Sequence, residues 1–117
     1  MKVLVVDDDF DQLGIRALLL RKSGFEVFEA GGRLEARRLA ADHRPDCAVI
    51  DLNMPTSADG LALIRDLKLI NPEIHLIVLT GADTQVFETR GEAALVDEVV
   101  KKPAGSAQLI QKLKAYA

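Results

Sequence analysis

The chain has 117 residues, 49% of them hydrophobic and 28% charged, which is the composition of an ordinary globular domain. Its 15 basic and 18 acidic side chains give a net charge of −3 without a basic tract, which argues against direct binding of nucleic acid. The longest apolar runs have four residues, too few to span a membrane, and the single cysteine, Cys47, fits a reducing compartment. We therefore expect one cytoplasmic domain over residues 1–117, with no contact to nucleic acid or membrane.

Short apolar runs alternate along the chain with segments of helical period. The expected strands cover residues 3–6, 26–30, 47–50, 76–79 and 99–100. The expected helices cover residues 10–22, 33–42, 61–70 and 84–95, followed by a last helix that Ser106 caps, and residues 54–60 are expected to form a loop. A strand and helix repeated in this order predict a single α/β domain with a doubly wound, five-stranded parallel sheet covered by helices on both faces.

Polar residues follow the expected strands where each strand ends. They are Asp7, Asp8, Asp51, Thr80 and Lys102. Ligands of parallel sheets bind outside the carboxyl ends of the strands. If the first and third strands are neighbours, the three aspartates meet at one edge, where two carboxylates about 4 Å apart repel by about 4 kcal/mol at an effective dielectric constant of about 20. Such a cluster calls for a hard divalent cation, and we expect Mg²⁺.

The chemistry of these side chains suits phosphoryl transfer. An aspartate such as Asp51 can act as a nucleophile and form an aspartyl phosphate. Lys102 supplies a point charge for phosphate oxygens, and Thr80 supplies a hydrogen bond. Taken alone, residues 7–9 could simply end a strand while Asp11 caps the next helix, and Lys102 and Thr80 could be ordinary surface and strand residues. Their common position at strand ends is what indicates a site.

Four stretches of the chain resemble the receiver domain of two-component response regulators. They are VLVVDDD at the start, VIDLNMP around Asp51, LIVLTGA around Thr80 and VVKKP around Lys102, in the family's order and across essentially the whole chain. The resemblance implies a flavodoxin-like, CheY-like three-layer sandwich. It also implies that Asp51 is the phosphoacceptor and that Mg²⁺ is held by Asp7, Asp8, Asp51 and the backbone carbonyl of Asn53.

The resemblance further implies how the domain switches. Thr80 matches the hydroxyl that moves onto the phosphoryl group, and Lys102 matches the catalytic lysine. The chain departs from the family at Val99, where the aromatic side chain of the usual switch is replaced, and at Gly60, which falls one residue later than usual. The implied partners are a sensor histidine kinase or histidine phosphotransfer protein and a downstream effector protein or domain, with a homodimer possible. The output surface would comprise residues 84–95, 99–100 and 106–116.

Three other interpretations remain open. A receiver-like interaction module that is not phosphorylated is one, and Val99 favours it. A haloacid-dehalogenase-type phosphatase with Asp7 as nucleophile is another, although Asp11 replaces the usual Thr or Val and no acidic pair follows Lys102. A flavin-binding protein is the third, but the aspartates after the first strand would repel its phosphate. In the preferred interpretation the chain is a signalling phosphoprotein and not an enzyme, although it assists its own phosphorylation and dephosphorylation.

Overall fold

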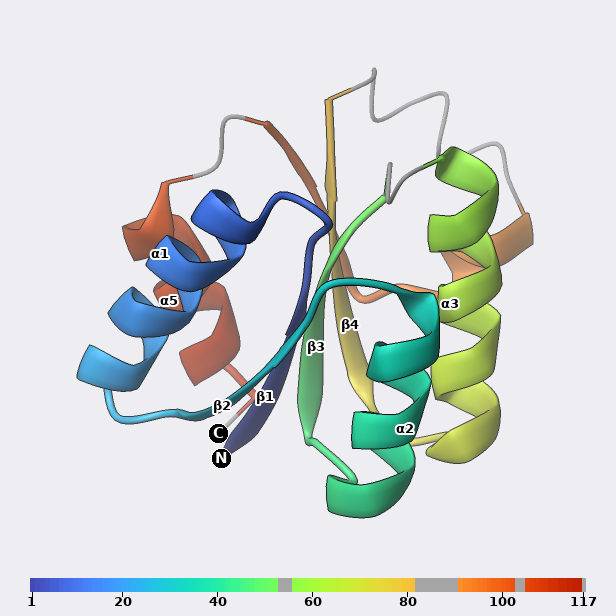
Figure 1. The fold of residues 1–117 in the computed structure, drawn as a ribbon, viewed down its shortest axis with the longest axis horizontal. Helices are drawn as coiled ribbons and strands as arrows, with labels where there is room; N and C mark the ends of the chain where they lie inside the picture. Colours follow the sequence, from blue (N-terminus) through green and yellow to red (C-terminus); the bar gives the residue numbers. More distant parts are fainter. Residues whose placement is uncertain (53–55, 82–90, 103–104, 117) are drawn as a thin grey trace.

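The computed structural model describes residues 1–52, 56–81, 91–102 and 105–116. Its centre is a five-stranded sheet in the order β2-β1-β3-β4-β5, with every neighbouring pair parallel (Figure 1). The strands are β1 (Lys2–Val6), β2 (Glu26–Ala30), β3 (Cys47–Asp51), β4 (His75–Thr80) and β5 (Glu98–Lys101). Each predicted strand is therefore confirmed to within one residue at either end.

Helices cover both faces of this sheet, which confirms the predicted three-layer architecture. On one face lie α1 (Phe10–Lys22) and α5 (Ser106–Lys114), and on the other lie α2 (Arg33–His43) and α3 (Ser57–Ile70) (Figure 1). Because both faces are covered, a central strand such as β3 is buried at each of its positions and needs no alternation of polar and apolar residues.

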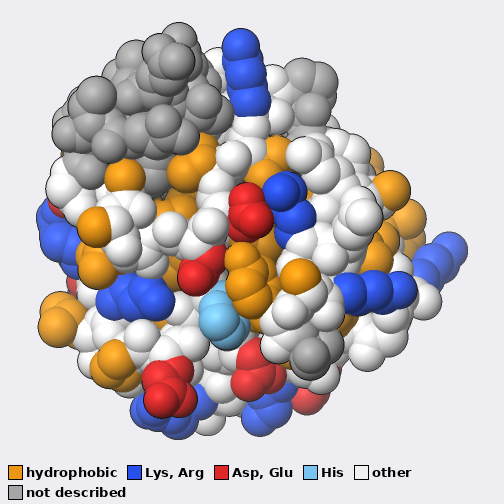
Figure 2. All heavy atoms as spheres, turned by 180° about the vertical axis from the view of Figure 1, so that it is seen from behind, with side chains coloured by type: hydrophobic (Ala, Val, Ile, Leu, Met, Phe, Trp, Pro, Cys, Tyr) orange, Lys and Arg blue, Asp and Glu red, His pale blue; other side chains and the backbone are white. Residues whose placement is uncertain are grey.

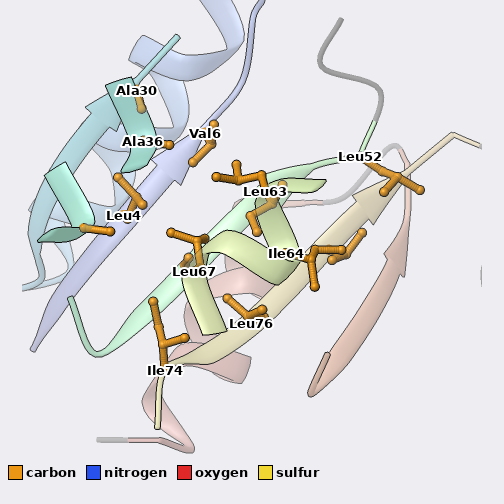
Figure 3. Close-up of a cluster of buried hydrophobic side chains, with 14 of the residues drawn as sticks. Leu4, Val6, Ala30, Ala36, Leu52, Leu63, Ile64, Leu67, Ile74 and Leu76 are labelled. Atoms are coloured by element: carbon orange, nitrogen blue, oxygen red, sulfur yellow. The ribbon is translucent and has the colours of Figure 1, made fainter. Parts of the chain in front are cut away.

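Two apolar clusters hold the layers together. Between the sheet and the α2–α3 layer, Leu4, Ile64, Leu67 and Leu76 belong to a continuous set of buried side chains (Figure 3). A second cluster lies between the sheet and the α1–α5 layer and includes Leu20. This packing leaves the carboxyl ends of the strands outside the core, at the edge where the polar residues lie.

Two predicted helix boundaries are wrong. The predicted loop over residues 54–60 ends earlier, because α3 begins at Ser57 after Thr56, whose hydroxyl accepts a hydrogen bond from the backbone N–H of Asp59 at 3.3 Å. The last helix begins at Ser106, and Gly105 occupies the capping position before it, so the predicted cap at Ser106 is wrong.

The helix predicted over residues 84–95 can be compared with the structure only at residues 91–95. Residues 84–90 lie outside the described residues, and Gly91–Leu95 forms a 3₁₀ helix, η1, instead of the predicted α-helix. An ion pair between Arg65 of α3 and Glu92 connects η1 to the neighbouring layer. A tighter 3₁₀ turn is typical of such short connecting pieces.

Candidate functional site

Three aspartates meet at the carboxyl edge of the sheet. Asp7 and Asp8 follow β1, and Asp51 is the last residue of β3. These strands are neighbours, with Val6 paired to Ile50, and here the strand order changes direction. One carboxylate oxygen from each aspartate lies within 4.8 Å of the others. The predicted convergence of the acids is confirmed, at the position where open parallel sheets bind their ligands.

Two of these acids are removed from solvent. Asp7 is 2% exposed and Asp51 is 5% exposed, whereas Asp8 is open to solvent. Burying a carboxylate is costly unless a cation and hydrogen bonds accompany it. The surroundings of Asp7 and Asp51 show how the chain meets that requirement.

Lys102 accompanies Asp51. Its Nζ donates to Oδ2 of Asp51 at 2.6 Å, although Asp51 ends β3 and Lys102 follows β5, with β4 between these two strands. The backbone N–H of Lys102 donates to the carbonyl of Thr80 at 2.8 Å, which holds the residue directly after β5. The Lys102 side chain is 33% exposed, so its ammonium faces both the buried acid and the solvent.

Arg16 accompanies Asp7 and was missed by sequence reasoning. Its Nη1 donates to Oδ2 of Asp7 at 3.0 Å, while the backbone N–H of Asp9 donates to Oδ1 at 2.9 Å. The Arg16 side chain is only 11% exposed. A signal was available in the sequence, since Arg16 lies three residues after Leu13 and four before Leu20, on the edge of the apolar face of α1.

The remaining predicted residues occupy different surroundings. Thr80 ends β4 at the same edge and is fully buried. Val99 lies on β5, paired with Val78, and is partly buried against the α2–α3 side of the core. Asn53 lies outside the described residues.

The cluster opens into a pocket of about 530 Å³. Among the described residues, the pocket is lined by Asp7, Asp8, Asp9, Gln12, Arg16, Asp51 and Lys102. Carboxylate oxygens are the ligands that Mg²⁺ selects, and Mg²⁺ sites use few carboxylates and keep room for water and phosphate oxygens, so this donor set fits the ion. A larger groove of about 990 Å³ runs along α2, but Glu35 is the one carboxylate in its described lining, and it lacks the acids that such an ion needs.

The face of the molecule drawn in Figure 2 is mixed in character. On the face seen in Figure 2, lysine and arginine side chains are scattered among acidic and hydrophobic ones. Nucleic-acid-binding proteins instead gather their basic residues into a patch or stripe. Within the described residues, none of the helices has the length and apolar character needed to cross a membrane.

Comparison with known proteins finds relatives that all belong to one class, the response regulators. The pattern of the response regulator receiver domain matches residues 3–114. The chain is 38% identical over 114 residues to the transcriptional regulatory protein PrrA of Mycobacterium tuberculosis, covering 97% of this chain and 48% of PrrA. It is 33% identical over 118 residues to the response regulator MprA of Mycobacterium avium, covering 98% and 50% respectively. The chain thus spans about half the length of these curated relatives.

Solved structures show the same fold. A response regulator receiver domain protein from Clostridium thermocellum superposes with a TM-score of 0.88 at 26% identity, covering 98% of this chain and 92% of that one. A response regulator protein from Burkholderia pseudomallei, solved with a phosphorylated aspartic acid, a calcium ion and citrate, superposes with a TM-score of 0.83 at 25% identity, covering 97% and 71%. The chain therefore belongs to the response regulator receiver domain family of two-component signalling, and its acidic cluster matches the family's phosphorylation site.

Proposed function

We propose that residues 1–117 form one receiver domain that accepts a phosphoryl group on the side chain of Asp51. The observation that supports this assignment is the position of Asp51, buried beside Asp7 and Asp8 with the ammonium of Lys102 at 2.6 Å. The donor is a phosphohistidine on a sensor histidine kinase or on a histidine phosphotransfer protein. The phosphorylated aspartic acid of the Burkholderia pseudomallei structure supports the same chemistry.

Receiver domains bind Mg²⁺ at an acidic pocket, and we assign the ion here to Asp7, Asp8 and Asp51. The resemblance adds the backbone carbonyl of Asn53, which lies outside the described residues. When bound, Mg²⁺ would offset the negative charge of the incoming phosphoryl oxygens. Asp8 is exposed and reaches the pocket directly, whereas Asp7 is engaged with Arg16.

In the proposed transfer, a carboxylate oxygen of Asp51 attacks the phosphorus atom. The phosphorus–nitrogen bond to the donor imidazole breaks, and its electron pair returns to the ring. Lys102 stabilises the charge on the phosphoryl oxygens, and the hydroxyl of Thr80 donates to one of them. Attack by water on the aspartyl phosphate later releases inorganic phosphate and restores Asp51, so the domain assists both its own phosphorylation and its own dephosphorylation.

The added charge of about −1.5 to −2 then changes the surface that partners recognise. We assign this output surface to residues 84–95 together with β5 and α5. Val99 cannot rotate as an aromatic ring does, so its part in the switch is a change of packing against the core. The effector is a downstream protein or domain, and the same surface would serve a homodimer. We place this activity in the cytoplasm, without direct contact to nucleic acid.

The test is incubation of the full chain with acetyl phosphate and Mg²⁺, followed by intact mass spectrometry. We expect the mass to rise by one phosphoryl group in the wild type and in Asp9→Asn, and to stay unchanged in Asp51→Asn. A label that persists in Asp51→Asn but disappears in Asp7→Asn would favour the phosphatase chemistry. A wild type that takes up no label would favour the interaction module.

A further inference from the structure

The pocket that we assign to Mg²⁺ contains a basic side chain that the proposed reaction does not use. The described lining of the pocket contains four carboxylates and two cations, Lys102 and Arg16. Lys102 faces Asp51, the group that would receive the phosphoryl. Arg16 instead faces Asp7, an acid assigned to the metal.

The contacts of Asp7 place a cation beside any metal ion that this residue would bind. One oxygen accepts from the guanidinium of Arg16 and the other from the backbone N–H of Asp9. Asp8, by contrast, makes no carboxylate hydrogen bond or ion pair within the part of the chain that the structure describes. An ion that binds through Asp7 must therefore displace Arg16 or lie close to its positive charge.

The position of Arg16 is enforced by the fold. The residue is held on α1 between Leu13 and Leu20, both buried in the core, and its side chain is 11% exposed. A cation confined in this way is screened by solvent much less than a surface arginine. It also satisfies the carboxylate of Asp7 at 2% exposure, which would otherwise be a buried charge without a cation.

We propose that Arg16 is a built-in counter-cation that holds Asp7 in the metal-free domain and competes with Mg²⁺ for it. Arg16 is then a positioning residue, and it sets the Mg²⁺ concentration at which the domain becomes competent for phosphorylation. This inference rests on the proposed function, because it takes Asp7 to be part of the Mg²⁺ site.

The test is the affinity of the full chain for Mg²⁺ alone, measured by calorimetry and by amide shifts of Asp8. We expect Arg16→Gln to bind Mg²⁺ roughly five- to tenfold more tightly than the wild type, since one positive charge has left the pocket. Arg16→Lys keeps the charge and should bind with nearly wild-type affinity. The matched control is Arg21→Gln, which removes an exposed arginine of the same helix that pairs with Glu29 at 2.8 Å, and it should not change the affinity.

Thermal unfolding gives a second measurement, in which Arg16→Gln should lose stability although it gains affinity for Mg²⁺. Without Mg²⁺, Arg16→Gln should melt at a lower temperature than the wild type, and saturating Mg²⁺ should narrow this difference. If Arg16→Gln bound Mg²⁺ more weakly than the wild type or with the same affinity, the proposed role of Arg16 would be wrong, while the proposed function would stand. An equal gain of affinity in Arg21→Gln would have the same meaning. A wild type that binds no Mg²⁺ would instead refute the proposed function, and this inference with it.

Discussion

The Nζ atom of Lys102 lies 2.6 Å from Oδ2 of Asp51 and so joins the segment after β5 to the end of β3 across the intervening strand β4. This ion pair links the candidate phosphoacceptor to the part of the sheet from which an output surface would extend. A new phosphoryl group on Asp51 would compete for the same ammonium, which gives the reaction a direct route to β5.

Replacing Lys102 should therefore slow phosphorylation while leaving the acceptor in place. We expect Lys102→Met to reduce the rate of labelling by acetyl phosphate by on the order of a hundredfold, because a cation aimed at the transferring group is lost. Lys101→Met is the matched control, since Lys101 is exposed and ends β5, and it should label at nearly the normal rate. Equal rates in the two variants would show that Lys102 is not catalytic.

Gly60 should not tolerate a side chain. A Cβ atom built on it would lie 2.0 Å from the carbonyl oxygen of Leu52, a backbone atom that cannot rotate away. We expect Gly60→Ala to lower the free energy of unfolding by about 2 kcal/mol. Gly14→Ala is the control, because Gly14 is exposed on α1 with open space around it, and there alanine should raise stability by about 0.5–1 kcal/mol. Urea denaturation measures both changes, and two changes of the same sign would contradict the predicted close approach.

Asp9, and not Asp11, should stabilise the start of α1 as its N-terminal cap. The structure shows that Asp9 accepts from the backbone N–H groups of Asp11 at 3.0 Å and Gln12 at 3.2 Å, so the alternative with Asp11 as the cap is wrong. We expect Asp9→Ala to cost about 1 kcal/mol of stability and Asp11→Ala to cost less. The comparison is best made by urea denaturation without Mg²⁺, so that metal binding does not contribute. A larger loss in Asp11→Ala would reverse the assignment.

Cys47 should make stability fall at high pH. Burial, with smaller contributions from the charges of Asp46 and Asp97, raises the pKa of Cys47 to about 12 from its ordinary value of 9.0. Between these values the unfolded thiol loses its proton while the folded thiol keeps it, so the folded state binds more protons and the free energy of unfolding decreases as pH rises. The associated stability is fully present below pH 9 and declines toward pH 12.

The measurement is denaturation of the wild type and of Cys47→Ala from pH 8 upward. Lysine and tyrosine side chains also titrate in this range, so the informative quantity is the difference between the two curves. The wild type should lose stability more steeply, by up to about 1.4 kcal/mol per pH unit. Parallel curves would mean that the thiol ionises equally in both states. A thiol reagent should also modify native Cys47 only as fast as the protein opens.

Much of this protein could be predicted from local sequence patterns. The continuous apolar run Cys47–Ile50 predicts a strand buried on both faces, since only such a strand avoids alternation. Acids and a lysine placed after such strands predict a polar edge, because parallel strands all end on the same side. The resemblance to receiver domains extends this to a family, and the family match and relatives confirm that the chain belongs to it.

Other features depended on the tertiary structure. That Asp7 and Asp51 share a pocket requires β1 and β3 to be neighbours, and strand order depends on how the helices pack on the sheet rather than on any one segment. The sequence places Arg16 on the edge of the apolar face of α1, but only the rotation of α1 on the core brings its side chain to Asp7. Local periodicity determines which residues form an element, whereas long-range packing determines which side chains from separate elements come into contact.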